Sequence, residues 1–194
     1  MFTLRKSQPD KTHSIFEELV RRHEVSIYRV AYRLTGNHED AEDLVQEALL
    51  EAYAAFEKFK PGTYFDRWLF RILRNTYIDG TRARPRILLH SLDEPQAGES
   101  GVPMALEIAD WSNHPETQML AAVLDEPIQK GLMELPEEFR LVVVLSDMEG
   151  LSYEEISQIA NCPVGTVRSR LHRGRLLLKE KLERLLKARA PEEK

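Results

Sequence analysis

The chain has 194 residues, 42% of them hydrophobic, and a formal net charge of -5. This length suits one or two small folded domains, and the single cysteine, Cys162, excludes both an internal disulfide and a cysteine-based zinc site. No stretch approaches the roughly 20 apolar residues that span a bilayer, and no apolar run follows the N-terminus. We therefore expect a cytoplasmic protein with neither a signal peptide nor membrane insertion.

Three helices are predicted in the first part of the chain, because apolar residues recur there at helical spacing. They cover residues 14–34, about 37–58 and about 65–82, with a Pro-Gly turn at 60–63 between the last two. Gly80 should weaken the end of the third helix by about 1 kcal/mol relative to alanine, so we expect fraying there. No segment of any length shows the alternation of a β-strand.

A different composition begins near residue 85. Residues 85–114 have no apolar periodicity and hold Pro and Gly among Ser, Asp and Glu, and the overlapping segment 91–127 contains no Lys or Arg and eight Asp or Glu. Such a composition is typical of a flexible acidic linker. The expected fold is therefore all-α, with small helical domains at 10–84 and 115–190 joined by a linker at 85–114.

The second domain is predicted to begin with a helix near Pro115 that breaks at Leu135, followed by a buried helix from Glu137 to Met148. A helix-turn-helix motif follows. Ser152 and Glu155 fit a capping box at the start of its first helix.

The second helix of the motif begins after a turn formed by Asn161 and Cys162, and Pro163 suits its first position. Val164, Val167 and Leu171 must face the protein, so the opposite face is exposed to solvent. Arg, Ser and His on an exposed helix face can reach phosphates and base edges in a major groove. An ordinary helical hairpin with a solvated basic face is the alternative. The exposed face carries Thr166, Arg168, Ser169, His172 and Arg173.

Two basic segments support contact with nucleic acid, although the total charge does not. Residues 61–90 carry six Lys or Arg against two Asp or Glu, and residues 156–194 carry ten against four. Each segment can attract a phosphate backbone. Basic residues at the end of the last helix could instead complement its own dipole, but this explains Lys187 and Arg189 and not the arginines of residues 168–175.

An acidic segment at 40–48 is predicted to be helical, with Asp40, Asp43 and Glu47 on one face and apolar residues on the other. This face suits a basic partner, and the alternative is a merely solvated acidic surface. The sequence offers no His or second carboxylate cluster to complete a metal site. It also lacks an activated nucleophile and a Gly-rich phosphate loop, so we expect no metal, no cofactor and no enzymatic activity.

Aromatic residues alternate with arginines at 59–75, a composition that suits single-stranded DNA. Rings can stack on extruded bases, and guanidinium groups can hold the backbone. Trp68 fits equally well as a core residue and as a wedge against DNA, whereas Phe70 fits the core or a partner surface.

Three blocks in chain order, namely the acidic segment at 40–48, the aromatic and basic segment at 59–75 and the helix-turn-helix, resemble the extracytoplasmic-function (ECF) group of bacterial RNA polymerase sigma factors. The resemblance covers nearly the whole chain. The resemblance implies an alternative sigma factor that directs core RNA polymerase to promoters and helps to melt them. It also implies an acidic linker that threads through polymerase, here with residues 91–95. Because no regulatory domain is visible, we expect an external anti-sigma factor.

The resemblance assigns roles to particular residues of this sequence. The expected partner is core polymerase, with its β′ and β subunits, and a basic coiled coil of β′ would be contacted through Asp40, Asp43, Gln46 and Glu47. The minus-ten element, as single-stranded DNA, would be bound by Lys60, Thr63, Tyr64, Phe65, Trp68, Arg71, Arg74 and Asn75. The minus-thirty-five element would be read by the polar face of residues 166–173. Gly174 replaces the more usual alanine and is expected to loosen the second half of the recognition helix.

Two other functions remain open at this point. A stand-alone helix-turn-helix regulator would need a dimerisation or ligand domain in place of residues 10–84. A sigma mimic that sequesters an anti-sigma factor would have no need for Arg168 and Arg173.

Overall fold

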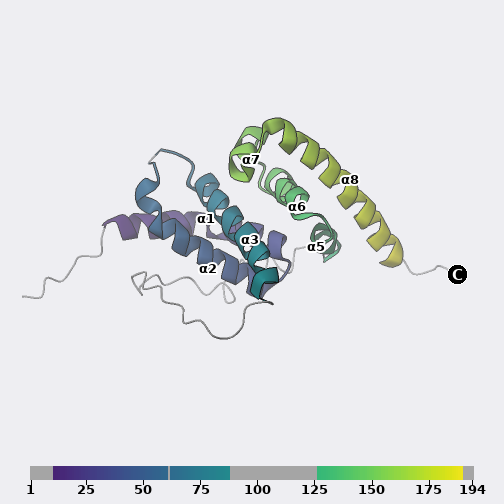
Figure 1. The fold of residues 1–194 in the computed structure, drawn as a ribbon, viewed down its shortest axis with the longest axis horizontal. Helices are drawn as coiled ribbons and strands as arrows, with labels where there is room; N and C mark the ends of the chain where they lie inside the picture. Colours follow the sequence, from purple (N-terminus) through teal and green to yellow (C-terminus); the bar gives the residue numbers. More distant parts are fainter. Residues whose placement is uncertain (1–10, 61, 88–125, 190–194) are drawn as a thin grey trace, which may run out of the picture.

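The computed structural model describes residues 11–60, 62–87 and 126–189. These residues contain helices and turns but no strand, which confirms the all-α class (Figure 1). Almost all of the predicted linker, and the start of the helix predicted from Pro115, lie outside the described residues.

The first half consists of three helices: α1 (Lys11–Thr35), α2 (His38–Ala54) and α3 (Phe65–Ile87). All three correspond to predicted helices. A short 3-10 helix, η1 (Phe56–Lys58), replaces the predicted last turn of α2. The fraying expected at Gly80 is wrong, because α3 continues to Ile87. One glycine destabilises a helix by only about 1 kcal/mol relative to alanine, which is too little to end a long helix.

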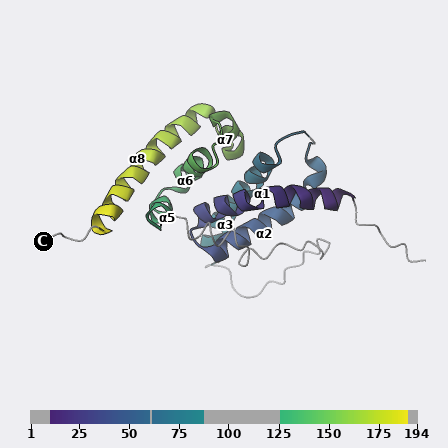
Figure 2. The same ribbon diagram turned by 180° about the vertical axis from the view of Figure 1, so that it is seen from behind.

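The second half contains α5 (Glu126–Met133), α6 (Glu137–Val143), α7 (Tyr153–Ala160) and α8 (Val164–Arg189). The helix predicted from Glu137 to Met148 is confirmed, but its last turn is a π-helix, η3 (Val144–Met148). Figures 1 and 2 show the long α8 running along the side of this half that faces away from α1, α2 and α3.

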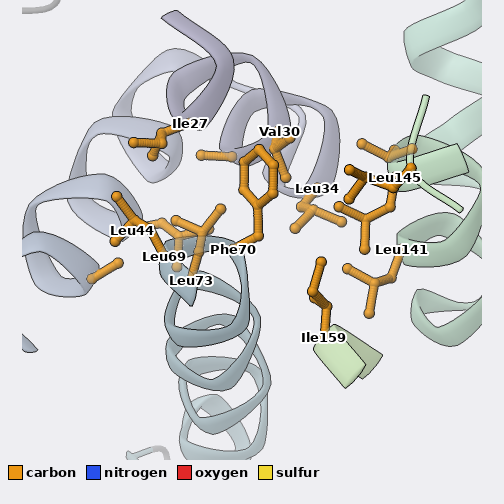
Figure 3. Packing of buried hydrophobic residues seen from close by; sticks show 14 of the residues in the cluster. Ile27, Val30, Leu34, Leu44, Leu69, Phe70, Leu73, Leu141, Leu145 and Ile159 are labelled. Atoms are coloured by element: carbon orange, nitrogen blue, oxygen red, sulfur yellow. The ribbon is translucent and has the colours of Figure 1, made fainter. Parts of the chain in front are cut away.

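Buried apolar residues of both halves form one continuous cluster. Phe70 of α3 is buried, as expected for a core or partner-facing residue. Figure 3 shows Leu34 and Phe70 on the side of the first half that faces the C-terminal helices. The two helical halves are thus in direct apolar contact, with α3 packed on α7 and α1 on α5 and α6. The C-terminal residues that approach them include Leu141, Leu145 and Ile159.

Gly174 lies where α8 crosses α6. A Cβ atom at this position would lie 2.8 Å from Cγ2 of Val143 and 3.4 Å from Cβ of Phe139. The expected loosening of the recognition helix is wrong, because α8 is uninterrupted from Val164 to Arg189. The missing side chain instead lets two helices approach closely.

Candidate nucleic-acid and partner interfaces

The helix-turn-helix motif is built as the sequence predicts. The hydroxyl of Ser152 accepts a hydrogen bond from the backbone N–H of Glu155, whose carboxylate accepts one from the backbone N–H of Ser152, at 3.3 and 2.9 Å. Asn161 ends α7 in the left-handed conformation, at φ 49°. The helix α8 begins at Val164, one residue later than predicted. The Ser157 hydroxyl fixes the turn by donating to the Cys162 carbonyl at 2.7 Å.

The predicted recognition face of α8 is largely solvent-exposed. Val167 and Leu171 are buried against the domain, and Thr166 is half-buried at the edge of the face. The exposed members are Arg168, Ser169, His172 and Arg173.

The arginines of α8 fall into two classes. Arg170 pairs with Glu138 at 2.6 Å, and Nε of Arg175 donates to Asp147 at 3.1 Å. Neither Arg168 nor Arg173 forms an ion pair with any described residue. These two side chains therefore keep their charge available for a ligand, whereas their neighbours hold α8 against α6 and η3.

The aromatic residues at the start of α3 separate into exposed and buried rings. Tyr64 is 68% exposed, whereas Phe65 is only 4% exposed. The ring of Phe65 packs edge-on against Phe16 and Phe59. The assignment of Phe65 to DNA stacking is therefore wrong for this structure, since its ring belongs to the core. Trp68 is half-buried and has its ring centroid 5.2 Å from that of Phe59.

A cleft of about 480 Å³ lies between the start of α3 and the helix-turn-helix. It brings together five of the eight residues predicted to bind the minus-ten element. Arg74 and Asn75 lie farther along α3, where Nη1 of Arg74 donates to Oδ1 of Asn75 at 2.9 Å. The cleft is lined by Lys58, Phe59, Lys60, Gly62, Thr63, Tyr64, Arg67, Trp68, Arg71, Glu155, Gln158 and Ile159.

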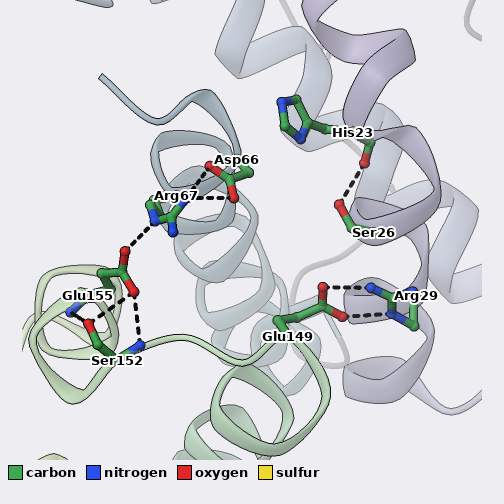
Figure 4. Close-up of polar contacts among 8 residues, drawn as sticks. All are labelled: His23, Ser26, Arg29, Asp66, Arg67, Glu149, Ser152 and Glu155. Carbon is green, nitrogen blue, oxygen red and sulfur yellow. Dashed lines mark hydrogen bonds and ion pairs between the residues drawn. The ribbon is translucent and has the colours of Figure 1, made fainter. Parts of the chain in front are cut away.

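Arg67 connects the two walls of this cleft. Among the described residues that line the cleft, it alone forms ion pairs both within α3 and with α7. Its guanidinium lies 3.9 Å from the centroid of the Tyr64 ring and 3.0 Å from the carboxylate of Asp66. Its Nε donates to Glu155 of α7 at 2.6 Å (Figure 4). The prediction from sequence missed Arg67. The Tyr64–Arg67 spacing of three residues at a helix start could have placed the two side chains together.

Glu155 is held by both halves of the molecule. The pKa of its carboxyl lies below its ordinary value, mainly because the backbone N–H of Ser152 donates to it, and also because Arg67 does. Charge-assisted hydrogen bonds of this kind favour the ionised form. The carboxylate is thus fixed in the cleft by the capping box of α7.

A second ionic contact joins the halves away from this cleft. Nε and Nη2 of Arg29 in α1 donate to the two carboxylate oxygens of Glu149, each at 2.7 Å (Figure 4). This bidentate geometry is the strong form of an arginine–carboxylate pair. It raises the pKa of Arg29, mainly because the guanidinium donates hydrogen bonds to the Glu149 carboxylate.

The acidic face of α2 is present as predicted. Asp43, Gln46 and Glu47 are exposed, whereas Asp40 is half-buried. The backbone N–H of Asp40 donates to the side chain of Asn37, which caps α2, at 2.8 Å. The three carboxylates line a groove of about 410 Å³, whose other wall includes Met133, Glu137 and Arg140 of the C-terminal half.

Two protein families match the chain. Sigma-70 region 2 matches residues 19–87, which contain most of α1 and all of α2 and α3. Sigma-70 region 4 matches residues 125–178, from α5 into the middle of α8. None of the described helices has the length and apolar character that crossing a membrane requires.

Relatives match the chain over most of its length. The ECF RNA polymerase sigma factor SigW of Bacillus subtilis is 38% identical over 170 residues, which cover 88% of this chain and 90% of SigW. SigE of Mycolicibacterium smegmatis is 43% identical over 167 residues, and the match spans 86% of this chain but only 61% of that relative's length. The sigma factor RpoE of Bartonella quintana, solved with the anti-sigma factor NepR, has a TM-score of 0.65 and 26% identity and covers 88% of this chain and 98% of its own.

Proposed function

The chain belongs to the ECF group of bacterial RNA polymerase sigma factors, and we propose that its surfaces divide core binding and promoter recognition among α2, α3 and α8. As a sigma factor it directs core RNA polymerase to promoters, so its mechanism consists of binding and strand capture. The observation that carries the residue assignments is the presence of three separate surfaces with different charge and exposure.

The upstream promoter element is read as duplex DNA by the exposed face of α8. Arg168 and Arg173 support this, because their guanidinium groups form no ion pair with described residues and can donate to guanine edges or phosphates. Ser169 and His172 lie on the same face and add shorter polar contacts.

The minus-ten element is bound as a single strand along the cleft at the start of α3. The exposed ring of Tyr64 offers a stacking surface, and Lys60 and Arg71 offer cations for the backbone. Trp68 lines this cleft, and its ring packs against Phe59 of the aromatic core. Phe65 supports the Trp68 ring from inside the core and does not touch DNA.

Core polymerase binds the acidic face of α2 through a basic coiled coil of its β′ subunit. The exposed carboxylates of Asp43 and Glu47 support this role, since opposite charges steer association and fix the orientation of partners. Gln46 lies on the same exposed helix surface, and Asp40 contributes at its edge.

An anti-sigma protein restrains this chain in the cytoplasm. The support is the similarity to RpoE of Bartonella quintana, which was solved in complex with an anti-sigma factor. Such a partner has to cover the surfaces assigned here to polymerase or promoter DNA.

Native-gel binding of duplex promoter DNA, with and without core polymerase, tests this assignment. A sigma factor should shift DNA specifically only together with core enzyme. Specific binding by the chain alone would support a stand-alone regulator. Failure to bind core enzyme or DNA, together with tight binding of an anti-sigma factor, would support a sigma mimic.

A further inference from the structure

The cleft assigned to the minus-ten strand is closed on one side by the helix-turn-helix. Five of its lining residues are charged, namely Lys58, Lys60, Arg67, Arg71 and Glu155. Glu155 is thus the one carboxylate among four cations in this described lining. Glu155 also forms an ion pair between α7 and α3, because its Oε1 accepts a hydrogen bond from Nε of Arg67 at 2.6 Å.

The position of Glu155 is set by its own helix. Its other oxygen accepts hydrogen bonds from the backbone N–H and the hydroxyl of Ser152, both at 2.9 Å. The Arg67 and Glu155 side chains are each 28% exposed, so the pair is partly shielded from water. The capping box that starts α7 therefore presents a fixed anion to the basic cleft.

We propose that the Glu155 carboxylate occupies the place of a DNA phosphate beside Arg67, so that the helix-turn-helix competes with single-stranded DNA for the minus-ten cleft. This inference rests on the proposed function of that cleft. A carboxylate and a phosphate accept the same charge-assisted hydrogen bonds from a guanidinium group. Separation of the two halves would release Arg67 for the DNA backbone.

The contact also affects the exposed stacking surface. The Arg67 guanidinium lies 3.9 Å from the centroid of Tyr64 and so covers one face of its ring. A base that stacks on this face must displace the guanidinium, which is held in place by Asp66 and Glu155. Loss of Glu155 from the cleft leaves Asp66 as the one described carboxylate that holds the guanidinium, which makes this displacement easier.

Glu155→Gln is the variant that tests the competition. Glutamine also serves at the third position of a capping box, so α7 keeps its cap while the anion is lost. Binding of a short fluorescein-labelled single-stranded DNA of randomised sequence to the full chain is followed by fluorescence anisotropy. We expect Glu155→Gln to bind about two- to fivefold more tightly than the wild type, the range that a partly exposed ion pair supports.

Two further variants make the test specific. Glu149→Gln removes the second ion pair that joins the halves among the described residues, and Glu149 lies outside the cleft lining. If it increases DNA affinity as much as Glu155→Gln does, simple separation of the halves explains the gain and the phosphate-site inference is overturned. In the Arg67→Gln background, Glu155→Gln should give no gain, because the competing pair is already gone. A full gain in that background would also overturn the inference.

Tyr64→Ala and Arg71→Ala, each made in the Glu155→Gln background, separate this inference from the assignment of the cleft. Both residues are exposed, so neither change should unfold the domain, and circular dichroism checks this. If neither weakens DNA binding, the cleft is not the DNA site, and both proposals fail. If they weaken binding but Glu155→Gln alone matches the wild type, only the competition by Glu155 is excluded.

Discussion

The guanidinium of Arg140 in α6 donates to the backbone carbonyl of Leu34 at the end of α1, with Nη1 and the oxygen 2.6 Å apart. The side chain is 6% exposed. Its other donors reach carbonyls at the end of α5 and the Tyr77 hydroxyl, so the C-terminal dipoles of two helices stabilise its charge. The remaining acceptors are Leu132 O, Met133 O, Leu135 O and Tyr77 OH, at 2.9 to 3.1 Å.

Replacing Arg140 with methionine should therefore destabilise the whole chain. The variant keeps an apolar side chain of similar length but leaves several buried carbonyls without a donor, at a cost of about 1–3 kcal/mol for each group that water cannot reach. We expect a loss of about 2–4 kcal/mol, measured by urea denaturation. The stability of Arg140→Lys should lie between those of the wild type and Arg140→Met, because lysine keeps the charge but has fewer hydrogen-bond donors than arginine. An unchanged urea midpoint would contradict this role.

Gly174→Ala should lower stability even though alanine is the better helix former. The added methyl group would meet Val143 at 2.8 Å, and such overpacking typically costs about 1–3 kcal/mol, against about 1 kcal/mol gained in helix propensity. Val143→Ala removes the clashing atom, so the double variant should be more stable than the sum of the two single changes predicts. Urea denaturation of the four proteins tests this, and a stabilising Gly174→Ala would disprove it.

Gly174 and the Arg67–Glu155 pair show where prediction from the sequence reaches its limit. Helix positions and the Ser152–Glu155 capping box are local patterns, and periodicity or spacing sufficed to predict them. Gly174 looked like a weakness because only its propensity was visible. Its close approach to α6 depends on how two helices cross, which no local pattern contains. The contact between Arg67 and Glu155 joins residues far apart in the chain and was missed for the same reason.

Arg168→Ala and Arg173→Ala should each weaken binding of the upstream promoter element by about 1–3 kcal/mol, and one base position should become less specific for each. Binding to core polymerase should not change. Footprinting of the holoenzyme on promoter DNA and pull-downs with core enzyme measure the two effects.

Arg170→Ala is the matched control for these substitutions, because Arg170 lies on the same helix but pairs with Glu138. It should reduce DNA affinity less than either of the other changes. Equal losses from all three variants would indicate a general effect of charge, and loss of core binding would argue against the assigned face.

Reversal of Asp43 and Glu47 to lysine should abolish association with core polymerase while the chain stays folded, because both side chains are exposed on α2. The proposed partner surface is basic, so each reversal replaces attraction by repulsion. Gel shifts of core enzyme measure binding, and circular dichroism measures folding. The same charge change at Glu57 and Glu180, which are exposed on other elements, should leave association intact. Unfolding of the double variant would instead assign the two carboxylates a structural role.

The adjacent rings of Tyr64 and Phe65 should give opposite phenotypes. Composition could not distinguish them, but one is exposed to the cleft and the other is buried in the aromatic core. Phe65→Ala should lower the free energy of unfolding by about 3–5 kcal/mol, as large-to-small changes in a core do. Tyr64→Ala should leave the thermal unfolding midpoint nearly unchanged.

The effect of Tyr64→Ala should appear in promoter opening. A lost stacking contact costs about 1–3 kcal/mol, which is sufficient to shift the opening equilibrium tenfold or more. The closed complex should form normally, since α8 and the acidic face of α2 are untouched. Permanganate reactivity of thymines near the start site reports opening, and a promoter pre-melted by mismatches should restore transcription. Wild-type opening by a folded Tyr64→Ala variant would exclude this ring as a stacking surface.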